Sequence, residues 1–429
     1  MSGFGLMALK YGAETLLIHS VTGRWLTPLD YLNPLLSARE AVLGQHDWLV
    51  WPLVAWTLPF LWVGVSMTLR RAEDAGILPF VALFYFFPYV NYALMLALCL
   101  WPAAQQVGTE QLEVAQAESG DALRSALLGV LSGVAIALAM VGLSVWLFGS
   151  YGTTLFVATP FVMGAASAFL FNRRARRPLG ATLLVSVATV MIAGGAILLF
   201  ALEGVLCLLM AGPIGFTMAT MGAILGRAVA LRGKIQPRGL AAIALQLPLF
   251  AGAEAARLPQ GPLEVLTRIE ISAPPEAVWS RVVEFSEIPE PPALVLRLGI
   301  AYPERASIRG RGVGALRRCE FSTGAFQEPI TVWDEPRRLA FDVRAQPPAL
   351  KELSPYRHVL ARHLDGYLNV RRGEFRLIPL PSGRTRLEGR TFYELRVYPA
   401  AYWSFFSDAL IHVIHRRVLE HIKALAESS

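Results

Sequence analysis

The pattern of apolar and polar positions changes near residue 256. Before that point, long apolar runs are separated by short polar breaks, whereas later residues alternate over short stretches. A helix that crosses a membrane needs about 20 predominantly apolar residues. The pattern therefore predicts a polytopic α-helical membrane domain over residues 1–256, a linker over 257–262 and a globular α+β domain over 263–429.

Eight apolar segments are candidate membrane helices. Segment 3–21 contains Lys10 and Glu14, which can pair on one helix face. Segment 77–101 is broken at Pro88 and Asn91, and a re-entrant hairpin there would keep the basic loops on one side of the membrane; the alternative is a single crossing, which leaves one basic loop on the wrong side. Segment 239–256 is short and contains Gln246 and Pro248, so its crossing stays open. The five uninterrupted segments are 48–68, 123–148, 151–171, 179–202 and 204–226.

The globular part predicts one strand, a short helix, six further strands and a long terminal helix. The first strand covers 263–272, and Pro274 and Pro275 open the short helix. Along the last strand Leu387, Tyr393 and Leu395 share one face, and arginines and glutamates share the other, which we expect to face solvent. The other strands are expected near 303–310, 315–321, 326–334, 338–345 and 367–378, with the last strand over 384–397 and the terminal helix over 399–426.

Composition sharpens this division. The chain is 54% apolar and 17% charged, against about 45–50% and about 25% in soluble proteins. Residues 1–256 hold 14 basic and 12 acidic side chains, and the remaining residues hold 25 and 20. This excludes a fully soluble enzyme, a disordered chain and a fibrous repeat. The net charge of +7 forms no dense basic tract, so we expect no nucleic-acid partner.

Basic loops predict the orientation in a bacterial inner membrane. Arg70 and Arg71, the cluster 173–177 and the cluster 227–238 follow apolar segments and should be cytoplasmic. The side of the globular domain depends on whether 239–256 crosses, and the pattern leans towards an extracytoplasmic domain. The strong segments contain essentially no ionisable residue, which argues against a transporter. Small residues at Gly164, Gly194–Gly195 and Gly212 predict close helix packing instead.

Candidate chemistry is sparse. Asp408 and His412 lie four residues apart on the terminal helix, so a carboxylate can orient an imidazole for acid–base work, with Tyr393 as a further candidate; the alternative is an exposed helical pair. Adding His415 gives a poor metal site without a fourth ligand. Cys99, Cys207 and Cys319 show no metal or disulfide spacing. We expect no cofactor and no metal.

Two further motifs lie in loops of the globular part. His358, His363 and Asp365 lie in the insertion 346–366, which is a lid over a cavity, a membrane-resting segment or a solvated loop. The glycines of 310–314 join two strands and open no helix, so we expect a hairpin turn rather than a phosphate site.

The run Ile-Glu-Ile-Ser-Ala-Pro-Pro-Glu-Ala-Val-Trp over 269–279 resembles the opening of the START-like helix-grip superfamily, which includes polyketide cyclases/dehydrases and pollen allergens. The resemblance covers about 263–427. It implies a curved antiparallel sheet around the last helix, with a cavity for lipids, sterols, polyketides or aromatic compounds; plain core is the alternative for the same side chains. The expected cavity residues are Phe341, Val343, Phe375, Leu377, Leu387, Tyr393, Leu395, Trp403, Phe406 and Leu410.

A second resemblance concerns residues 3–102. The run Leu-Arg-Arg-Ala-Glu-Asp-Ala-Gly over 69–76 is similar to an Arg-Arg-Leu-His-Asp-x-Gly motif of an uncharacterised bacterial inner-membrane family. Here Ala72 and Glu73 replace the Leu-His pair, and the family's upstream Gly-Arg-x-x-Arg motif is degenerate at 37–40. The resemblance implies topology and little else.

The function expected from the sequence is membrane-anchored binding of a hydrophobic small molecule or lipid, with membrane lipids as partners. One alternative is a membrane-associated cyclase or dehydratase that uses Asp408, His412 or Tyr393. The other is a scaffold or sensor that couples ligand occupancy to the membrane helices.

Overall fold

The computed structural model describes residues 3–27, 49–77, 81, 90–102, 109–232, 244–256, 261–354, 361–364 and 366–428. The chain divides into two compact units. The first comprises residues 1–149, 153–254 and 354–361, and the second comprises residues 150–152, 255–353 and 362–429.

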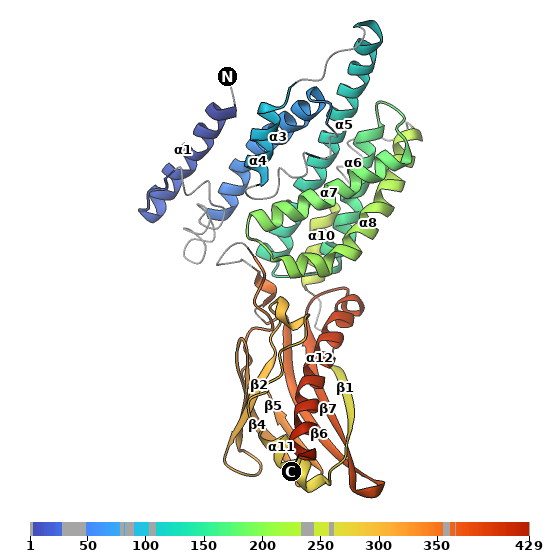
Figure 1. Ribbon diagram of the computed structural model, residues 1–429. Helices are drawn as coiled ribbons and strands as arrows, with labels where there is room; N and C mark the ends of the chain where they lie inside the picture. Colours follow the sequence, from blue (N-terminus) through green and yellow to red (C-terminus); the bar gives the residue numbers. More distant parts are fainter. Residues whose placement is uncertain are drawn as a thin grey trace. The chain divides into compact units, whose positions relative to one another are not determined.

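The described part of the first unit is helical (Figure 1). Its helices are α1 (Gly3–Thr22), α3 (Val50–Asp74), α4 (Val90–Leu100), α5 (Thr109–Val141), α6 (Thr159–Asn172), α7 (Leu179–Leu199), α8 (Val205–Arg232) and α10 (Gln246–Ala255). A π-helical turn extends α5 to Leu147, and another precedes α6 from Thr154. The apolar runs become helices because only a helix satisfies every backbone polar group within one segment.

Four of these helices are long and apolar enough to cross a membrane. They cover 120–147, 154–172, 179–199 and 205–232, in agreement with the predicted segments 123–148, 151–171, 179–202 and 204–226. The predicted segments 3–21 and 48–68 form α1 and α3, whose crossing stays a prediction. The bend of the predicted hairpin at Pro88 lies outside the described residues, as does the start of segment 239–256.

Lys10 and Glu14 pair within α1, as their spacing predicted. The Lys10 Nζ lies 2.7 Å from Glu14 Oε1, and both side chains are buried. Thr57 Oγ1 of α3 donates to the same carboxylate oxygen at 3.2 Å, and Trp56 Nε1 donates to the Lys10 carbonyl at 3.3 Å. The charges that interrupt this apolar run are therefore paired and hydrogen-bonded between two helices, which lowers the cost of burying them.

Small residues let α6 and α8 pack closely. A Cβ on Gly164 would lie 1.9 Å from the Ala219 carbonyl oxygen, and a Cβ on Gly222 would lie 1.9 Å from the Phe161 carbonyl oxygen. Only glycine allows these approaches, so the packing role predicted for Gly164 is confirmed. The same prediction was wrong for Gly194, where nothing lies within 4 Å of an added Cβ, and for Gly212, where the nearest atom lies at 3.8 Å. The apolar pattern does not tell which helix faces meet.

Polar contacts distinguish two ends of this helix bundle. At one end Arg174 and Arg177 pair with Asp121 at 3.2 and 3.6 Å, and Arg227 donates to the Arg177 carbonyl. We call this the arginine end. At the other end the Thr154 amide donates to Glu254 Oε2 at 2.8 Å. Arg227 near the end of α8 and Glu254 near the end of α10 therefore lie at opposite ends of the bundle.

The described residues of the second unit form one antiparallel sheet and two α-helices. The described strands have the order β1-β7-β6-β5-β4-β3-β2, and the sheet curves around α12 (Figure 1). They are β1 (Leu263–Ile271), β2 (Pro303–Arg309), β3 (Leu316–Phe321), β4 (Gly324–Asp334), β5 (Arg338–Asp342), β6 (Leu368–Leu380) and β7 (Arg384–Leu395), and the helices are α11 (Pro275–Val283) and α12 (Ala400–Glu427). The strand and helix ranges agree with those predicted from the alternation of apolar residues.

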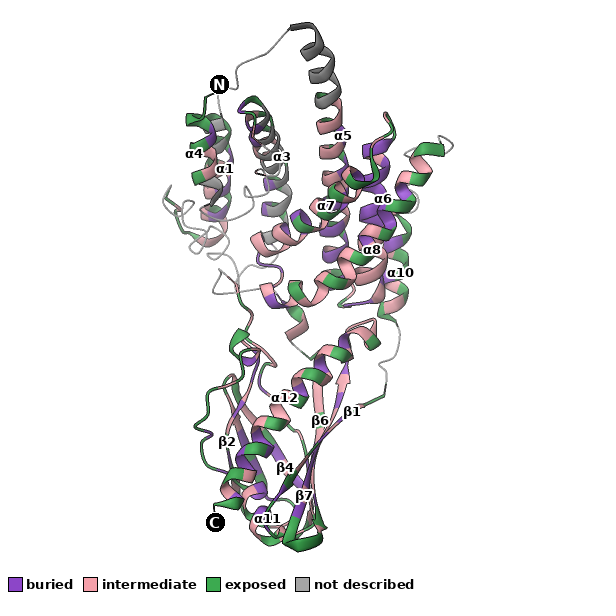
Figure 2. Cartoon of the chain, turned by 45° about the vertical axis from the view of Figure 1, so that its right-hand side comes forward, coloured by how far each residue is buried: buried purple, intermediate pink, exposed green. Residues whose placement is uncertain are grey.

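The core lies between α11, the C-terminal half of α12 and the inner face of the sheet (Figure 2). α12 packs against β1 and β7 near one edge of the sheet and against β2 at the other edge. Core side chains with no exposed surface are Ile271, Val278, Val282, Leu339, Leu387, Leu419 and Ile422.

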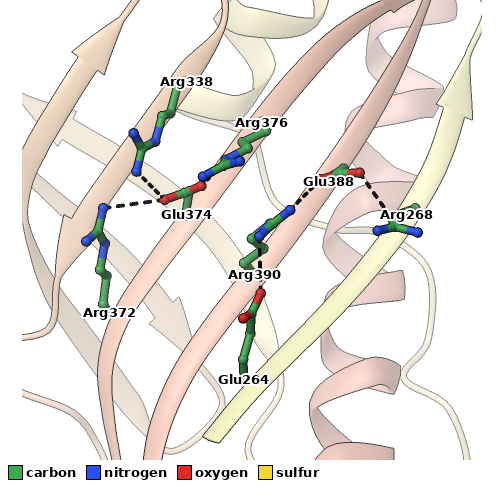
Figure 3. A network of polar contacts seen from close by, with 8 residues as sticks. All are labelled: Glu264, Arg268, Arg338, Arg372, Glu374, Arg376, Glu388 and Arg390. Atoms are coloured by element: carbon green, nitrogen blue, oxygen red, sulfur yellow. Dashed lines mark hydrogen bonds and ion pairs between the residues drawn. The ribbon is translucent and has the colours of Figure 1, made fainter. Parts of the chain in front are cut away.

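The outer face of the sheet carries ladders of arginine and glutamate (Figure 3). Glu374 of β6 contacts Arg338, Arg372 and Arg376, while Glu388 of β7 contacts Arg268 and Arg390 at 3.0 Å each. Burial alone would raise the pKa of Glu374, but hydrogen bonds from Arg338 and Arg376 hold it below its ordinary value.

The expectation that this face is solvent is therefore only partly correct. Glu374 and Glu388 are 3% and 5% exposed, because arginine side chains from the same strand and from the adjacent strand contact each carboxylate. The strand alternation identifies the charged face, but it does not show which charges the neighbouring strands bury.

Candidate functional site

The interior of the sheet has two unlike ends. The closed end holds the β2–β3, β4–β5 and β6–β7 turns and the C-terminus of α12. The open end holds the start of β1, the end of β7 and the start of α12. Inward-facing side chains near the closed end are tightly buried: Leu339 and Leu387 have no exposed surface. Towards the open end Val343, Leu368 and Val370 are only partly buried. Leu368 and Val370 pair with Leu395 and Tyr393 on the inner face, and Val343 follows Phe341 in the alternation of β5.

The ten predicted cavity residues divide between these two environments. Phe341, Leu377 and Leu387 belong to the packed core, and Phe375 packs against it, so these four follow the plain-core alternative. Tyr393, Leu395 and Trp403 are buried nearer the open end, and Val343, Phe406 and Leu410 are partly buried. The last six side chains lie in the part of the unit nearer the open end.

Tyr393 of β7 and Asp408 of α12 face each other. The Tyr393 hydroxyl donates to Asp408 Oδ1 at 2.6 Å. Burial and the nearby carboxylate raise the pKa of Tyr393 well above its ordinary value, so the phenol stays protonated. The Asp408 carboxylate therefore faces β7 and hydrogen-bonds to Tyr393. The predicted acid–base pair of Asp408 with His412 is not formed, because His412 contacts Thr267 of β1 instead.

His412 joins a different chain of hydrogen bonds. Thr267 Oγ1 of β1 lies 2.8 Å from His412 Nδ1 and 2.9 Å from His415 Nδ1, and Thr391 Oγ1 of β7 lies 2.7 Å from His415 Nε2. The threonine hydroxyl can donate to one imidazole while it accepts from the other. Burial, followed by the neighbouring His412, lowers the pKa of His415 to about 4. His415 is therefore neutral at neutral pH and fixes α12 on β1 and β7.

Sequence reasoning missed a buried ion pair on the inner face of β3 and β4. Arg317 and Glu328 are 2% and 5% exposed and are hydrogen-bonded to each other. Arg317 Nε also donates to the Val283 carbonyl at 3.2 Å, and the guanidinium lies 5.3–5.8 Å from the ring centres of Phe285, Phe341 and Phe375. Burial raises the pKa of Glu328 above its ordinary value, although the charge of Arg317 and its hydrogen bond partly offset this rise.

A signal for this pair was present in the sequence. Arg317 occupies the alternate position between Ala315 and Cys319, both of which are buried core residues. A cation in phase with apolar residues of a strand indicates an inward side chain that needs a partner. The adjacent Cys319 thiol has its pKa raised to about 12, by burial first and then by the charge of Glu328, so it is no reactive thiolate.

The insertion 346–366 is described only in part. His358 and Asp365 lie outside the described residues. His363 Nε2 lies 3.3 Å from Glu352 Oε1, so this histidine has a carboxylate partner within the same insertion. The lid role stays a prediction. The glycines of 310–314 form the turn between β2 and β3, as expected, with positive φ at Gly310, Gly312 and Gly314.

The arrangement of α12 on the sheet decides the fold. A long C-terminal helix lies across a curved antiparallel sheet and packs at both of its edges. The globular unit has a helix-grip fold. This confirms the fold expected for the globular part from the 269–279 run.

Comparisons with known proteins add little to this assignment. No protein-family model matches the chain, and no curated protein is significantly similar to it. The helix-grip unit is similar to the solved norcoclaurine synthase of Thalictrum flavum, at 12% identity over 40% of this chain and 98% of that chain, with a TM-score of 0.27. It is also similar to the Zhui aromatase/cyclase of Streptomyces, at 16% identity over 39% and 94%, with a TM-score of 0.26.

Scores this low carry no argument about activity, and the fold assignment rests on the strand order and the position of α12. The resemblance of residues 69–76 to an inner-membrane family receives no support from these comparisons.

Proposed function

We propose that the protein is a membrane-anchored binding protein whose helix-grip unit holds an apolar small molecule or lipid between the sheet and the N-terminal half of α12. The observation that carries the proposal is the gradient of burial along the inner face. Leu339 and Leu387 are fully buried at the closed end, whereas Val343, Leu368 and Val370 are partly exposed at the open end. Contact between these inward-facing apolar side chains and water costs free energy, and a bound apolar ligand would remove that cost by covering them.

The polar groups nearby suit binding better than catalysis. Tyr393 is a protonated donor that already hydrogen-bonds to Asp408, and His415 is a partly buried neutral imidazole held by two threonines. A general base needs a pKa near the working pH and a free acceptor aimed at the substrate. These groups instead supply fixed hydrogen-bonding positions beside an apolar surface, as ligand-binding sites do.

Site-specific cross-linking tests the proposal. A photoreactive benzoylphenylalanine at position 370, on the inner face of β6, is expected to capture an apolar compound during expression of the full chain. The matched control is position 332 of β4, also a partly buried valine but on the outer face of the sheet. Mass spectrometry of the peptides should show an adduct at position 370 and none at position 332. Equal adducts at both positions, or none at position 370, would contradict the proposed site.

We further propose that the helix-grip unit is extracytoplasmic. The arginine end of the bundle gathers Arg174, Arg177 and Arg227, and positively charged loops stay in the cytoplasm. Glu254 contacts the Thr154 amide at the opposite end, and the chain continues from there into β1. This supports the crossing of segment 239–256 that the sequence left open.

Reporter fusions test this orientation. Alkaline phosphatase fused after Ser429 is expected to be active, because that enzyme matures only outside the cytoplasm. The same reporter fused within the loop after Arg174 is expected to be inactive, and a green fluorescent protein should show the reverse pattern. An inactive phosphatase at the C-terminus, with the loop fusion behaving as expected, would place the domain in the cytoplasm.

A further inference from the structure

Large apolar side chains are exposed on three segments of the helix-grip unit near its open end. Leu294 and Leu298 are 78% and 42% exposed, Leu353 is 41% exposed and Phe405 is 69% exposed. We call these four residues the apolar rim. Contact with water is unfavourable for these four large apolar side chains, and a cover over this end of the unit would remove that cost.

The described backbone holds the segments of the rim in place. The 3-10 turn Leu296–Leu298 ends at Gly299, which has φ 102°. A Cβ on Gly299 would lie 2.1 Å from the Lys351 carbonyl oxygen, so only glycine allows this approach. The Lys351 amide donates to the Gly299 carbonyl at 2.8 Å, and Ile300 pairs with Leu350. Leu298 and Leu353 therefore lie on two paired segments.

The start of α12 carries the remaining rim residue. Phe405 lies in the second turn of α12, after β7 ends at the open end. Its ring meets the Phe406 ring at 5.5 Å, while the adjacent Tyr402, Trp403 and Phe406 rings contact one another. Phe405 stays exposed because the aromatic rings of Trp403 and Phe406 already occupy the more buried faces of the helix.

Charge and connectivity point to the occupant. Arg297 and Lys351 are exposed beside the rim leucines. Leucine and aromatic side chains flanked by cations are typical of surfaces that rest in the headgroup region of a membrane. α10 ends at Ala255 and β1 begins at Leu263 at the open end, so a connection of seven residues leads from the apolar helices into the open end.

We propose that the apolar rim inserts into the headgroup region of the lipid bilayer that holds the helices, so that the open end takes up its ligand from the membrane surface. This deepens the proposed function and rests on it, because it names the membrane surface as the source of the ligand.

Depth-dependent quenching in the full chain tests the rim. Phe405→Cys is labelled with the dye NBD in a chain that also carries Cys99→Ser and Cys207→Ser, and the protein is placed in nanodiscs that contain nitroxide-labelled phospholipid. The matched control is Val313→Cys, which is also 69% exposed but lies in the β2–β3 turn at the closed end. The dye at position 405 is expected to shift to the blue and to be quenched by shallow nitroxides, whereas the dye at position 313 stays water-like and unquenched.

A third label separates failure of the rim from failure of membrane anchoring. Met191→Cys of α7 is 49% exposed and lies inside an apolar helix. Quenching at position 191 without quenching at position 405 would overturn the rim but leave the membrane anchor intact. A blue shift at position 405 without nitroxide quenching would show that protein, such as a second copy of the chain, covers the rim. Absence of quenching at position 191 would overturn the membrane anchor and the rim together.

Discussion

Replacement of Arg317 by methionine is expected to lower the free energy of unfolding of the helix-grip unit by about 3–5 kcal/mol. The reason is that the Glu328 carboxylate would remain buried among aromatic rings without its cation. The double variant Arg317→Met/Glu328→Leu removes both charges and is expected to recover most of the loss, because buried pairs rarely exceed apolar replacements in stability. Urea titration of the full chain in micelles, followed by hydrogen exchange of the β3 and β4 peptides, measures these differences.

The chain offers a matched control for this experiment. Arg305 and Glu320 form an ion pair at 2.6 Å between β2 and β3, but the Arg305 side chain is 59% exposed. Arg305→Met should change the stability little, since water solvates the remaining carboxylate. If the double variant were as unstable as Arg317→Met alone, the ion pair would itself stabilise the fold. The loss in the single variant would then not come from leaving the Glu328 carboxylate buried without a partner.

Acidification from pH 6.5 to pH 4 is expected to destabilise the helix-grip unit through His415. The ordinary pKa of this histidine is 6.5, and in the folded unit burial and His412 lower it to about 4. A proton therefore binds the unfolded chain first, so the contribution of His415 is complete above pH 6.5 and is lost as the pH falls towards 4. One proton changes the free energy of unfolding by at most about 1.4 kcal/mol per pH unit.

His415→Gln isolates this contribution. Glutamine can still hydrogen-bond Thr267 and Thr391 but carries no proton in this range. Thermal unfolding of the full chain, followed at several pH values between 4 and 7.5, should show a shallower loss for the variant than for the native chain. Identical slopes for the two proteins would mean that His415 titrates normally in the folded state.

Much of the fold was predictable because both kinds of pattern are local. Runs such as 179–202 can bury their backbone only as helices, and the alternation over 263–272 suits a strand with one buried face. The contacts between elements were harder to predict. Gly222 is as apolar as its neighbours in sequence, and only the approach of the Phe161 carbonyl shows that no side chain fits there.

The sequence identified polar residues of the candidate site but not the hydrogen bonds that they form. Tyr393, Asp408 and His412 were all identified from the sequence, yet Asp408 binds Tyr393 and His412 binds Thr267. Helical spacing places Asp408 and His412 on one face, but β1 and β7 offer each of them a partner across the interface. Local spacing describes only one helix, whereas a hydrogen bond depends on whatever packs against it.

The sequence by itself determined the division into an apolar helical part and an α+β part, as well as the order of the strands along the chain and the faces that they bury. These features follow from where apolar residues recur, which any local segment reveals. Only the tertiary structure decided that Arg317 lies inside beside Glu328, that arginines cover Glu374, and that the inner face is fully buried at one end but partly exposed at the other. Burial of a charge or exposure of an apolar side chain depends on neighbours far away in the sequence, and these meet only when the sheet curves around α12.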